Sequence, residues 1–304
     1  MKNTILSAGN ATMDVLLNVP FAPHDGRLVC SKDRYMFTPG GSGAYTAVAA
    51  KRAGASSILC SRVGEDETGL RLIEHLREAG VDVNCITADP KAQTALEVYL
   101  LEEYGLGGKI SYAGANACLN CENLEFAFSR YPDLFTTDLR INRSVLKYAA
   151  ELTRIQSVPF VLDASGAIDS GSIVGLMGVD ILVANEESVE KLTGVRLSTT
   201  DNCLRACIAL CDMLPLKFVV LKLGDRGAYI YDGTYCELLM SPNLQSVDTT
   251  AEHECFVGTF CAHFIDNKDV YYATKYALAA SSICTSRVGG FVSLPTDEDI
   301  RKLL

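Results

Sequence analysis

The chain has 304 residues, of which 48% are hydrophobic and 21% are charged, an ordinary balance for a globular protein with a sizeable core. Its formal net charge of −10 leaves no basic footprint for nucleic acid or for an anionic membrane surface. The short apolar stretch at the start predicts a first strand rather than a signal peptide, and no apolar run reaches the roughly 20 residues of a membrane span. We therefore expect a cytoplasmic protein whose partners are small molecules or proteins.

The cysteines predict packing rather than disulfides. Twelve cysteines are scattered through predicted strands and helices, which is typical of reduced, buried thiols. Cys118 and Cys121 form a single CxxC without a second pair at zinc-ribbon spacing, so a metal site there is disfavoured. Cys203, Cys207 and Cys211 recur every four residues on one face of a predicted helix, which indicates a place in the core.

Predicted elements follow one another in two patterns along the chain. Two β-rich patches lie at 14–38, where no helix interrupts the strands, and at 94–114, and we expect them to pair into one lid. Elsewhere strands and helices alternate, which predicts a largely parallel sheet covered by helices, with ligands at the carboxyl ends of its strands. The strands are expected at 5–11, 57–64, 160–164, 180–185, 217–224, 227–233 and 234–240, and the helices at 43–54, 68–80, 144–158, 186–194, 200–213, 255–265 and 271–287.

A series of motifs runs through this pattern in a recognisable order. They are GGSGA at 40–44, RVGED at 62–66, YAGANACL at 112–119, Asn185 followed by EKLTG, LGDRG at 223–227, DTT at 248–250, FVG at 256–258 and the closing segment 277–296. In this order they resemble the PfkB (ribokinase-like) carbohydrate kinase family. The resemblance implies a single α/β domain over 1–304, a three-layer sandwich with a mostly parallel central sheet flanked by helices, and a small β-sheet lid from about 12–38 and 93–113.

The resemblance also implies a reaction. Members of the family transfer the γ-phosphoryl group of ATP, with Mg²⁺, to a hydroxymethyl group of a sugar or nucleoside-like alcohol. The lid covers the sugar and often forms a dimer contact, so we expect a small-molecule substrate and a homodimer through the lid. Exposed edges of a small sheet also invite pairing.

The acceptor site implied by the resemblance lies near the first strand. Asp14 stands where the family places a carboxylate that accepts two adjacent hydroxyls, although an Asp there also suits a turn. Gly40 and Gly41 keep a glycine pair whose N–H groups approach the sugar closely. Thr12 and Tyr45 replace asparagines of the ribokinase version, so we expect an acceptor bound differently from ribose. Tyr45 either stacks on a flatter ligand or packs at the lid hinge.

The catalytic loop departs from the family pattern DTTGAGD, in which glycines form an anion hole and the last Asp is the base. Here residues 248–254 read DTTAEHE. We expect Ala251, Glu252 and His253 to form an altered phosphate loop whose backbone fails to direct N–H groups at a phosphate. Glu254 takes the position of the catalytic base, one methylene longer. We expect His253 to be solvated at the helix start, with donation to a phosphate as the alternative.

The nucleotide side carries a second departure. The resemblance implies contacts to ATP from Asn185, Lys222, Gly224, Gly227, Ala279 and Ser282. The family's NxxE motif begins at Asn185, but its fourth residue is Ser188 and not the Glu that organises water and Mg²⁺. We place the Mg²⁺ region near Asn185 and Glu187 without a direct protein ligand. Glu187 or Glu190 takes over the role of the missing Glu only if its side chain, which leaves the helix in a different direction, still reaches the metal.

These departures leave two main hypotheses. The first is an ATP-dependent sugar or nucleoside kinase with Glu254 as general base. The second is a catalytically inactive pseudokinase that acts as a small-molecule binding or interaction protein. A third hypothesis, a metal held by Glu252, His253, Glu254 and Cys255, is disfavoured because adjacent residues rarely converge on one ion.

Overall fold

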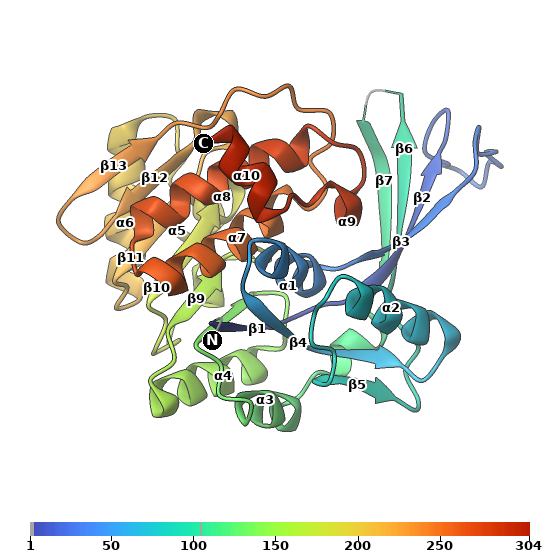
Figure 1. Ribbon diagram of the computed structural model, residues 1–304. Helices are drawn as coiled ribbons and strands as arrows, with labels where there is room; N and C mark the ends of the chain where they lie inside the picture. Colours follow the sequence, from blue (N-terminus) through green and yellow to red (C-terminus); the bar gives the residue numbers. More distant parts are fainter. Residues whose placement is uncertain (1–2, 104) are drawn as a thin grey trace.

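The computed structural model describes residues 3–103 and 105–304, so residues 1, 2 and 104 of the predicted domain and lid lie outside the described residues. Its main feature is a nine-stranded sheet with the order β13-β12-β11-β10-β9-β8-β1-β4-β5 (Figure 1). Neighbouring strands from β11 to β5 pair in parallel, and β12 and β13 add an antiparallel edge. The strands are β1 (Thr4–Ala8), β4 (Ser56–Gly64), β5 (Ile86–Asp89), β8 (Leu134–Asp138), β9 (Phe160–Asp163), β10 (Ile181–Asn185), β11 (Phe218–Lys222), β12 (Ala228–Tyr231) and β13 (Cys236–Leu239).

Helices cover both faces of this sheet, as predicted, and make a three-layer sandwich (Figure 1). One face carries α1 (Ser42–Arg52), α7 (Glu252–Asn267) and α8 (Val270–Thr285). The other carries α3 (Cys121–Phe128), α4 (Arg143–Gln156), α5 (Glu186–Thr193) and α6 (Thr200–Met213). The remaining helices are α2 (Glu67–Glu78), α9 (Gly290–Ser293) and α10 (Asp297–Leu303). No helix in the described ranges is both long and apolar enough to cross a membrane.

Continuous apolar runs explain why the strands are buried on both faces. In β8, Leu134 packs toward α7 and α8 while its neighbour Phe135 packs toward α3 and α4. Successive side chains of a strand point to opposite faces, so such a run fills two cores at once. Cys203 and Cys207 are buried in the core under α6, which confirms the predicted packing role of these thiols.

The lid is a separate four-stranded sheet with the order β3-β2-β6-β7. Its strands are β2 (Thr12–Asn18), β3 (Met36–Gly40), β6 (Leu96–Glu102) and β7 (Gly105–Tyr112). The two predicted patches meet in the parallel pair β2 and β6, where Asp14 lies opposite Glu97. The pairing confirms the predicted lid, which stands to one side of the large sheet (Figure 1).

Two elements between residues 114 and 142 were absent from the prediction. The buried strand β8 fits between β1 and β9 at the centre of the sheet, and α3 precedes it. Leu134-Phe135-Thr136-Thr137-Asp138 is a short run without alternation, a pattern that periodicity alone does not distinguish from part of a buried helix. This omission matters, because β8 ends at residues that contact the catalytic loop.

Candidate active site

Polar residues end four neighbouring strands at one edge of the large sheet. Asp138 ends β8, Asp163 ends β9, Asn185 ends β10 and Lys222 ends β11. The register places Asp138 beside Asp163 and Asn185 beside Lys222. The carboxyl ends of parallel strands are where open α/β sheets bind ligands, so this edge locates the candidate site.

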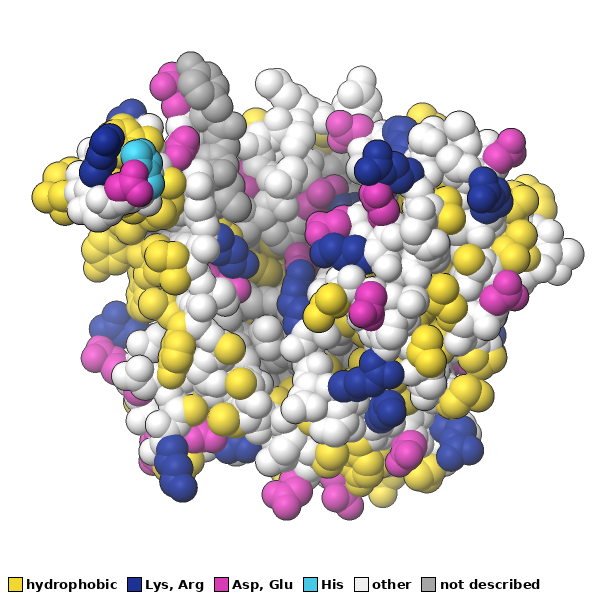
Figure 2. Space-filling view, turned by 180° about the vertical axis from the view of Figure 1, so that it is seen from behind, with side chains coloured by type: hydrophobic (Ala, Val, Ile, Leu, Met, Phe, Trp, Pro, Cys, Tyr) yellow, Lys and Arg dark blue, Asp and Glu magenta, His cyan; other side chains and the backbone are white. Residues whose placement is uncertain are grey.

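A cavity of about 630 Å³ lies between the lid and this edge. Its wall includes Asp14, Glu97 and Lys109 from the lid and Arg140, Ala251 and Glu254 from the sheet side. Figure 2 shows the molecule hollowed between the lid and the larger body, with charged side chains along the hollow. The volume is typical of a small-molecule site.

Asp14 is the buried carboxylate of this cavity, with 1% of its surface exposed. Its Oδ1 accepts a hydrogen bond from the hydroxyl of Thr12 at 2.6 Å, and its Oδ2 accepts one from the hydroxyl of Tyr45 at 3.3 Å. Burial raises the pKa of Asp14 to about 7, and the hydrogen bond from Thr12 offsets only part of that rise. Asp14 is therefore a carboxyl group that changes its charge near neutral pH.

The two glycines of the GG motif act on Asp14 and on the chain around it. A Cβ at Gly40 would overlap the carboxylate of Asp14, so Gly40 makes room for that side chain. Gly41 has a φ of +96°, lines the cavity and leads into α1. The glycine pair thus makes room for Asp14 and shapes the chain around it. This role is additional to the close approach to a sugar that the resemblance implies.

Tyr45 is buried and lines the cavity beneath the lid. Its hydroxyl donates to Asp14, and burial raises its pKa well above the ordinary value. Above it the lid presents a polar cluster in which Lys109 Nζ lies 2.7 Å from Oε2 of Glu97 and 4.8 Å from the ring centroid of Tyr99. Hydroxyl, carboxylate, ammonium and aromatic groups therefore face the same space, a set suited to a polyol.

One residue of the catalytic loop, Ala251, adopts a backbone conformation that favours glycine. Ala251 has a φ of +62° and lies at the N-cap of α7, so a residue with a Cβ adopts the left-handed conformation. In the described chain, the N–H groups of Ala251, His253 and Glu254 have no hydrogen-bond acceptor. The replacement of this glycine therefore does not prevent the left-handed conformation, which costs alanine about 1–2 kcal/mol, and the direction of the N–H groups toward a phosphate stays a matter of prediction.

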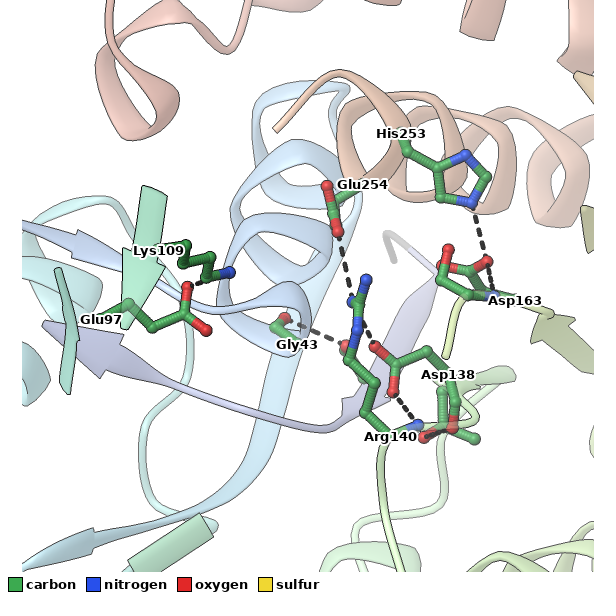
Figure 3. A network of polar contacts seen from close by, with 11 residues as sticks. Gly43, Glu97, Lys109, Asp138, Arg140, Asp163, His253 and Glu254 are labelled. Carbon is green, nitrogen blue, oxygen red and sulfur yellow. Dashed lines mark hydrogen bonds and ion pairs between the residues drawn. The ribbon is translucent and has the colours of Figure 1, made fainter. Parts of the chain in front are cut away.

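Glu252, His253 and Glu254 pair with residues at or just after the ends of three different strands. Glu252 Oε1 lies 2.6 Å from Lys222 Nζ, His253 Nε2 lies 2.7 Å from Asp163 Oδ1, and Glu254 Oε1 lies 3.5 Å from Arg140 Nη1. Figure 3 shows the last two pairs side by side under the start of α7. The three side chains point to separate partners, and the described residues contain no cluster of His, Cys, Asp and Glu that could hold a metal, so the loop does not assemble the hypothetical metal site.

His253 is a buried member of an ion pair, and the expectation of a solvated histidine is wrong. Its side chain is 13% exposed and that of Asp163 is 4% exposed. Burial by itself lowers the pKa of His253, but the adjacent carboxylate of Asp163 outweighs burial and holds it above the ordinary value. Burial likewise acts to raise the pKa of Asp163, and the contact with His253 reverses this and lowers it. The contact between the two side chains fixes the loop to β9.

Asp138 and Arg140 were missed by the sequence analysis. Asp138 Oδ2 lies 3.0 Å from Arg140 Nη1, and its Oδ1 accepts the backbone N–H of Arg140 at 2.9 Å. Burial raises the pKa of Asp138, and the guanidinium of Arg140 opposes the rise. The available signal was the position of an Asp at the end of a buried strand in an α/β sheet.

A match over almost the whole chain establishes the family to which the chain belongs. The family model described as pfkB family carbohydrate kinase matches residues 2–297. The chain belongs to the pfkB family of carbohydrate kinases. Membership confirms the predicted family and fold, and with them the expectation of a carbohydrate kinase that uses ATP and Mg²⁺.

Relatives of this pfkB member agree in length and shape. A ribokinase from Haemophilus influenzae is 25% identical over 307 residues, covering 100% of this chain and 99% of the relative. A ribokinase from Arabidopsis thaliana is 26% identical over 309 residues, covering 99% of this chain and 80% of the relative. The structure of Arabidopsis thaliana ribokinase complexed with ribose and ATP superimposes with a TM-score of 0.88 at 25% identity, covering 99% and 98% of the two chains.

The residues expected on the nucleotide side of this pfkB protein are engaged in local structure. Asn185 caps α5 by accepting the N–H of Ser188 at 2.8 Å, and Lys222 is occupied by Glu252. Gly224 and Gly227 have positive φ values of 56° and 98° in the turn after β11. Ala279 and Ser282 are buried in α8, where the hydroxyl of Ser282 lies 3.2 Å from that of Ser241. Their contacts to a nucleotide remain predictions.

The described residues fit a bound polyphosphate better than a preformed metal cage. The unpaired N–H groups at the start of α7 suit phosphate oxygens. Glu187 pairs with Lys191 at 2.6 Å and Glu190 pairs with Arg196 at 2.7 Å, both on the exposed side of α5. Because Mg²⁺ keeps several waters and binds largely through substrate phosphates, the protein supplies few ligands of its own. The region around Asn185 and Glu187 stays the predicted place for it.

Proposed function

We propose that the chain is an active kinase which transfers the γ-phosphoryl group of ATP to a hydroxymethyl group of a sugar or nucleoside-like alcohol. Asp14 holds the acceptor and Glu254 is the general base. One observation carries the proposal: both carboxylates line a single cavity next to a helix start where three N–H groups have no acceptor among the described residues. Binding group, base and phosphate donors thus meet in one place despite the altered loop.

The chain's own groups divide the reaction between them. Asp14, supported by Thr12 and Tyr45, accepts hydrogen bonds from acceptor hydroxyls and orients the sugar. Glu254 accepts the proton of the hydroxymethyl group as its oxygen forms a bond to the γ-phosphorus. The bond from that phosphorus to the bridging oxygen breaks, ADP leaves, and the proton on Glu254 passes to water.

The negative charge of the phosphoryl group is stabilised at the start of α7. The N–H groups of Ala251, His253 and Glu254 donate to the phosphoryl oxygens, which carry the charge of the transition state. Mg²⁺ held near Asn185 and Glu187 would supply positive charge that neutralises the polyphosphate. The lid and Tyr45 exclude water from the acceptor side, which limits transfer to water.

Pentoses are the first acceptors to test. The relatives from Haemophilus influenzae and Arabidopsis thaliana named above are ribokinases, and the solved Arabidopsis structure holds ribose and ATP. The replacement of two family asparagines by Thr12 and Tyr45 argues for a different acceptor within the same chemical class. A wider panel therefore includes hexoses, deoxypentoses, polyols and nucleosides.

The experiment measures ADP release by purified protein with ATP, Mg²⁺ and each acceptor. The controls are Glu254→Gln, which removes the base, and Asp14→Ala, which removes the acceptor contact. Release that depends on one acceptor and that both substitutions abolish supports the proposal. Thermal stabilisation by an acceptor without any ADP release contradicts it and favours the pseudokinase hypothesis.

We also propose that two copies associate through their lids. β3 and β7 are the edge strands of the lid, and apolar side chains on or beside them are exposed, namely Tyr35, Met36, Phe37, Ile110 and Tyr112. Figure 2 shows hydrophobic side chains gathered on this part of the surface. Light scattering coupled to gel filtration is expected to give a dimer that Phe37→Glu converts to a monomer, and a monomeric wild type contradicts the proposal.

A further inference from the structure

Arg140 is the residue whose guanidinium contacts the carboxylate of Glu254. It follows β8, lines the cavity and places Nη1 3.5 Å from Oε1 of Glu254. Figure 3 shows the guanidinium between Glu254 and Asp138, with one oxygen of Glu254 directed at Arg140 and the other directed away. The ion pair therefore holds one carboxylate oxygen and leaves the second available.

Surrounding groups fix Arg140 in this position. The carboxylate of Asp138, which is buried, accepts both the backbone N–H and Nη1 of Arg140 at 2.9 and 3.0 Å. Gly166 has a φ of +87°, and a Cβ there would lie 2.7 Å from Cγ of Arg140. One carboxylate thus anchors both ends of the residue, and a glycine clears the space for its aliphatic chain.

The length of the Glu254 side chain explains why a contact such as the one with Arg140, here called the clamp, is needed. Glu254 has one more rotatable bond than the Asp at this place in the family loop, so a free carboxylate samples more positions. A misplacement of about 1 Å at a reacting group lowers the rate by about 100-fold. A rigid partner beside Oε1 removes much of this freedom without occupying the second oxygen.

We propose that Arg140 is a positioning residue which holds Glu254 at the reach that phosphoryl transfer needs. The inference rests on the proposed kinase function and names Arg140 as the group that allows Glu254, the longer base, to act in phosphoryl transfer. Arg140 acts through Glu254, and the rate of transfer, rather than acceptor affinity, depends on it. A guanidinium in the same place that binds an anionic acceptor would instead control affinity.

Steady-state kinetics of the full-length protein separate these roles. Arg140→Gln is expected to lower kcat by about 100-fold while the acceptor KM stays within about threefold, and Arg140→Lys is expected to recover part of the loss. Arg205→Gln, at an exposed position of α6, is the matched control and is expected to leave both constants unchanged. A kcat for Arg140→Gln within threefold of wild type overturns the inference, and so does a raised acceptor KM with unchanged kcat.

Asp138→Asn gives a second measurement that keeps Arg140. It weakens the anchor without changing the size of the buried side chain, so kcat is again expected to fall with little change in KM, and an unchanged kcat counts against the clamp. Thermal melting and circular dichroism identify a variant that fails to fold, in which case the other variant decides. A wild type without turnover overturns the proposed function and this inference together, whereas an active wild type with an active Arg140→Gln overturns the inference alone.

Discussion

Asp14→Asn should stabilise the protein in a way that grows with pH. In the folded chain the pKa of Asp14 is raised to about 7 from the ordinary 3.8, chiefly by burial. The folded state therefore binds more protons than the unfolded state between these values, and stability falls as pH rises through that window. Asparagine has nearly the same shape, carries no charge, and pairs with the hydroxyls of Thr12 and Tyr45 through its amide.

The size of the effect follows from the shift. The full penalty for the ionised carboxylate is about 4 kcal/mol above pH 8, and about 1.5 kcal/mol of it is already present at pH 5. The gain in the free energy of unfolding on Asp14→Asn is thus expected to be larger at pH 8 than at pH 5 by about 2.5 kcal/mol. The same substitution removes an acceptor of sugar hydroxyls, so acceptor affinity is expected to fall by 10-fold to 100-fold.

Urea unfolding at pH 5 and pH 8 measures the gain, and acceptor titration measures the loss. Asp33→Asn, an exposed carboxylate in the lid segment, is the control and is expected to change stability equally at both pH values. A gain from Asp14→Asn that is the same at pH 5 and pH 8 refutes the assignment of a buried, titrating carboxylate. Unchanged acceptor affinity refutes its place in the acceptor site.

Two further substitutions test the catalytic loop. Ala251→Gly is expected to raise the free energy of unfolding by about 1 kcal/mol in urea denaturation without lowering kcat, because glycine adopts a φ of +62° without strain; a loss of stability would show that the conformation is not strained. His253→Gln is expected to cost about 2 kcal/mol in the same assay at pH 6. Because the pKa of His253 is raised in the folded state, its contribution is full below the unfolded value and lost as pH rises through the folded one, so a cost that grows from pH 6 to pH 9 contradicts the pairing with Asp163.

The order of motifs predicted the architecture well because the apolar patterns it depends on are local. Alternating segments around Asp14 and Glu97 predicted the lid strands, and capped amphipathic runs predicted the helices. The strand β8 was not predicted because its five consecutive buried residues show no hydrophobic periodicity. The site residue at its end, Asp138, was lost with it.

Side-chain pairing was beyond the sequence because it depends on which strand ends lie next to each other. Glu252, His253 and Glu254 look alike as a charged run, yet each pairs with a residue at or just after the end of a different strand, far away in the chain. Ala251 shows the same limit for the backbone, since it adopts a conformation that the local preference of alanine opposes. The loop lacks both family glycines in the sequence and still has a left-handed residue at the start of α7.

The most direct test is ³¹P NMR of ATP, Mg²⁺ and the best acceptor with wild type and with Glu254→Gln. An active kinase that uses Glu254 as its base is expected to produce a new phosphomonoester signal in step with ADP, and Glu254→Gln is expected to slow it by 100-fold or more. An acceptor that binds wild type but yields no phosphomonoester would contradict the account, as would a Glu254→Gln variant that forms it at the wild-type rate.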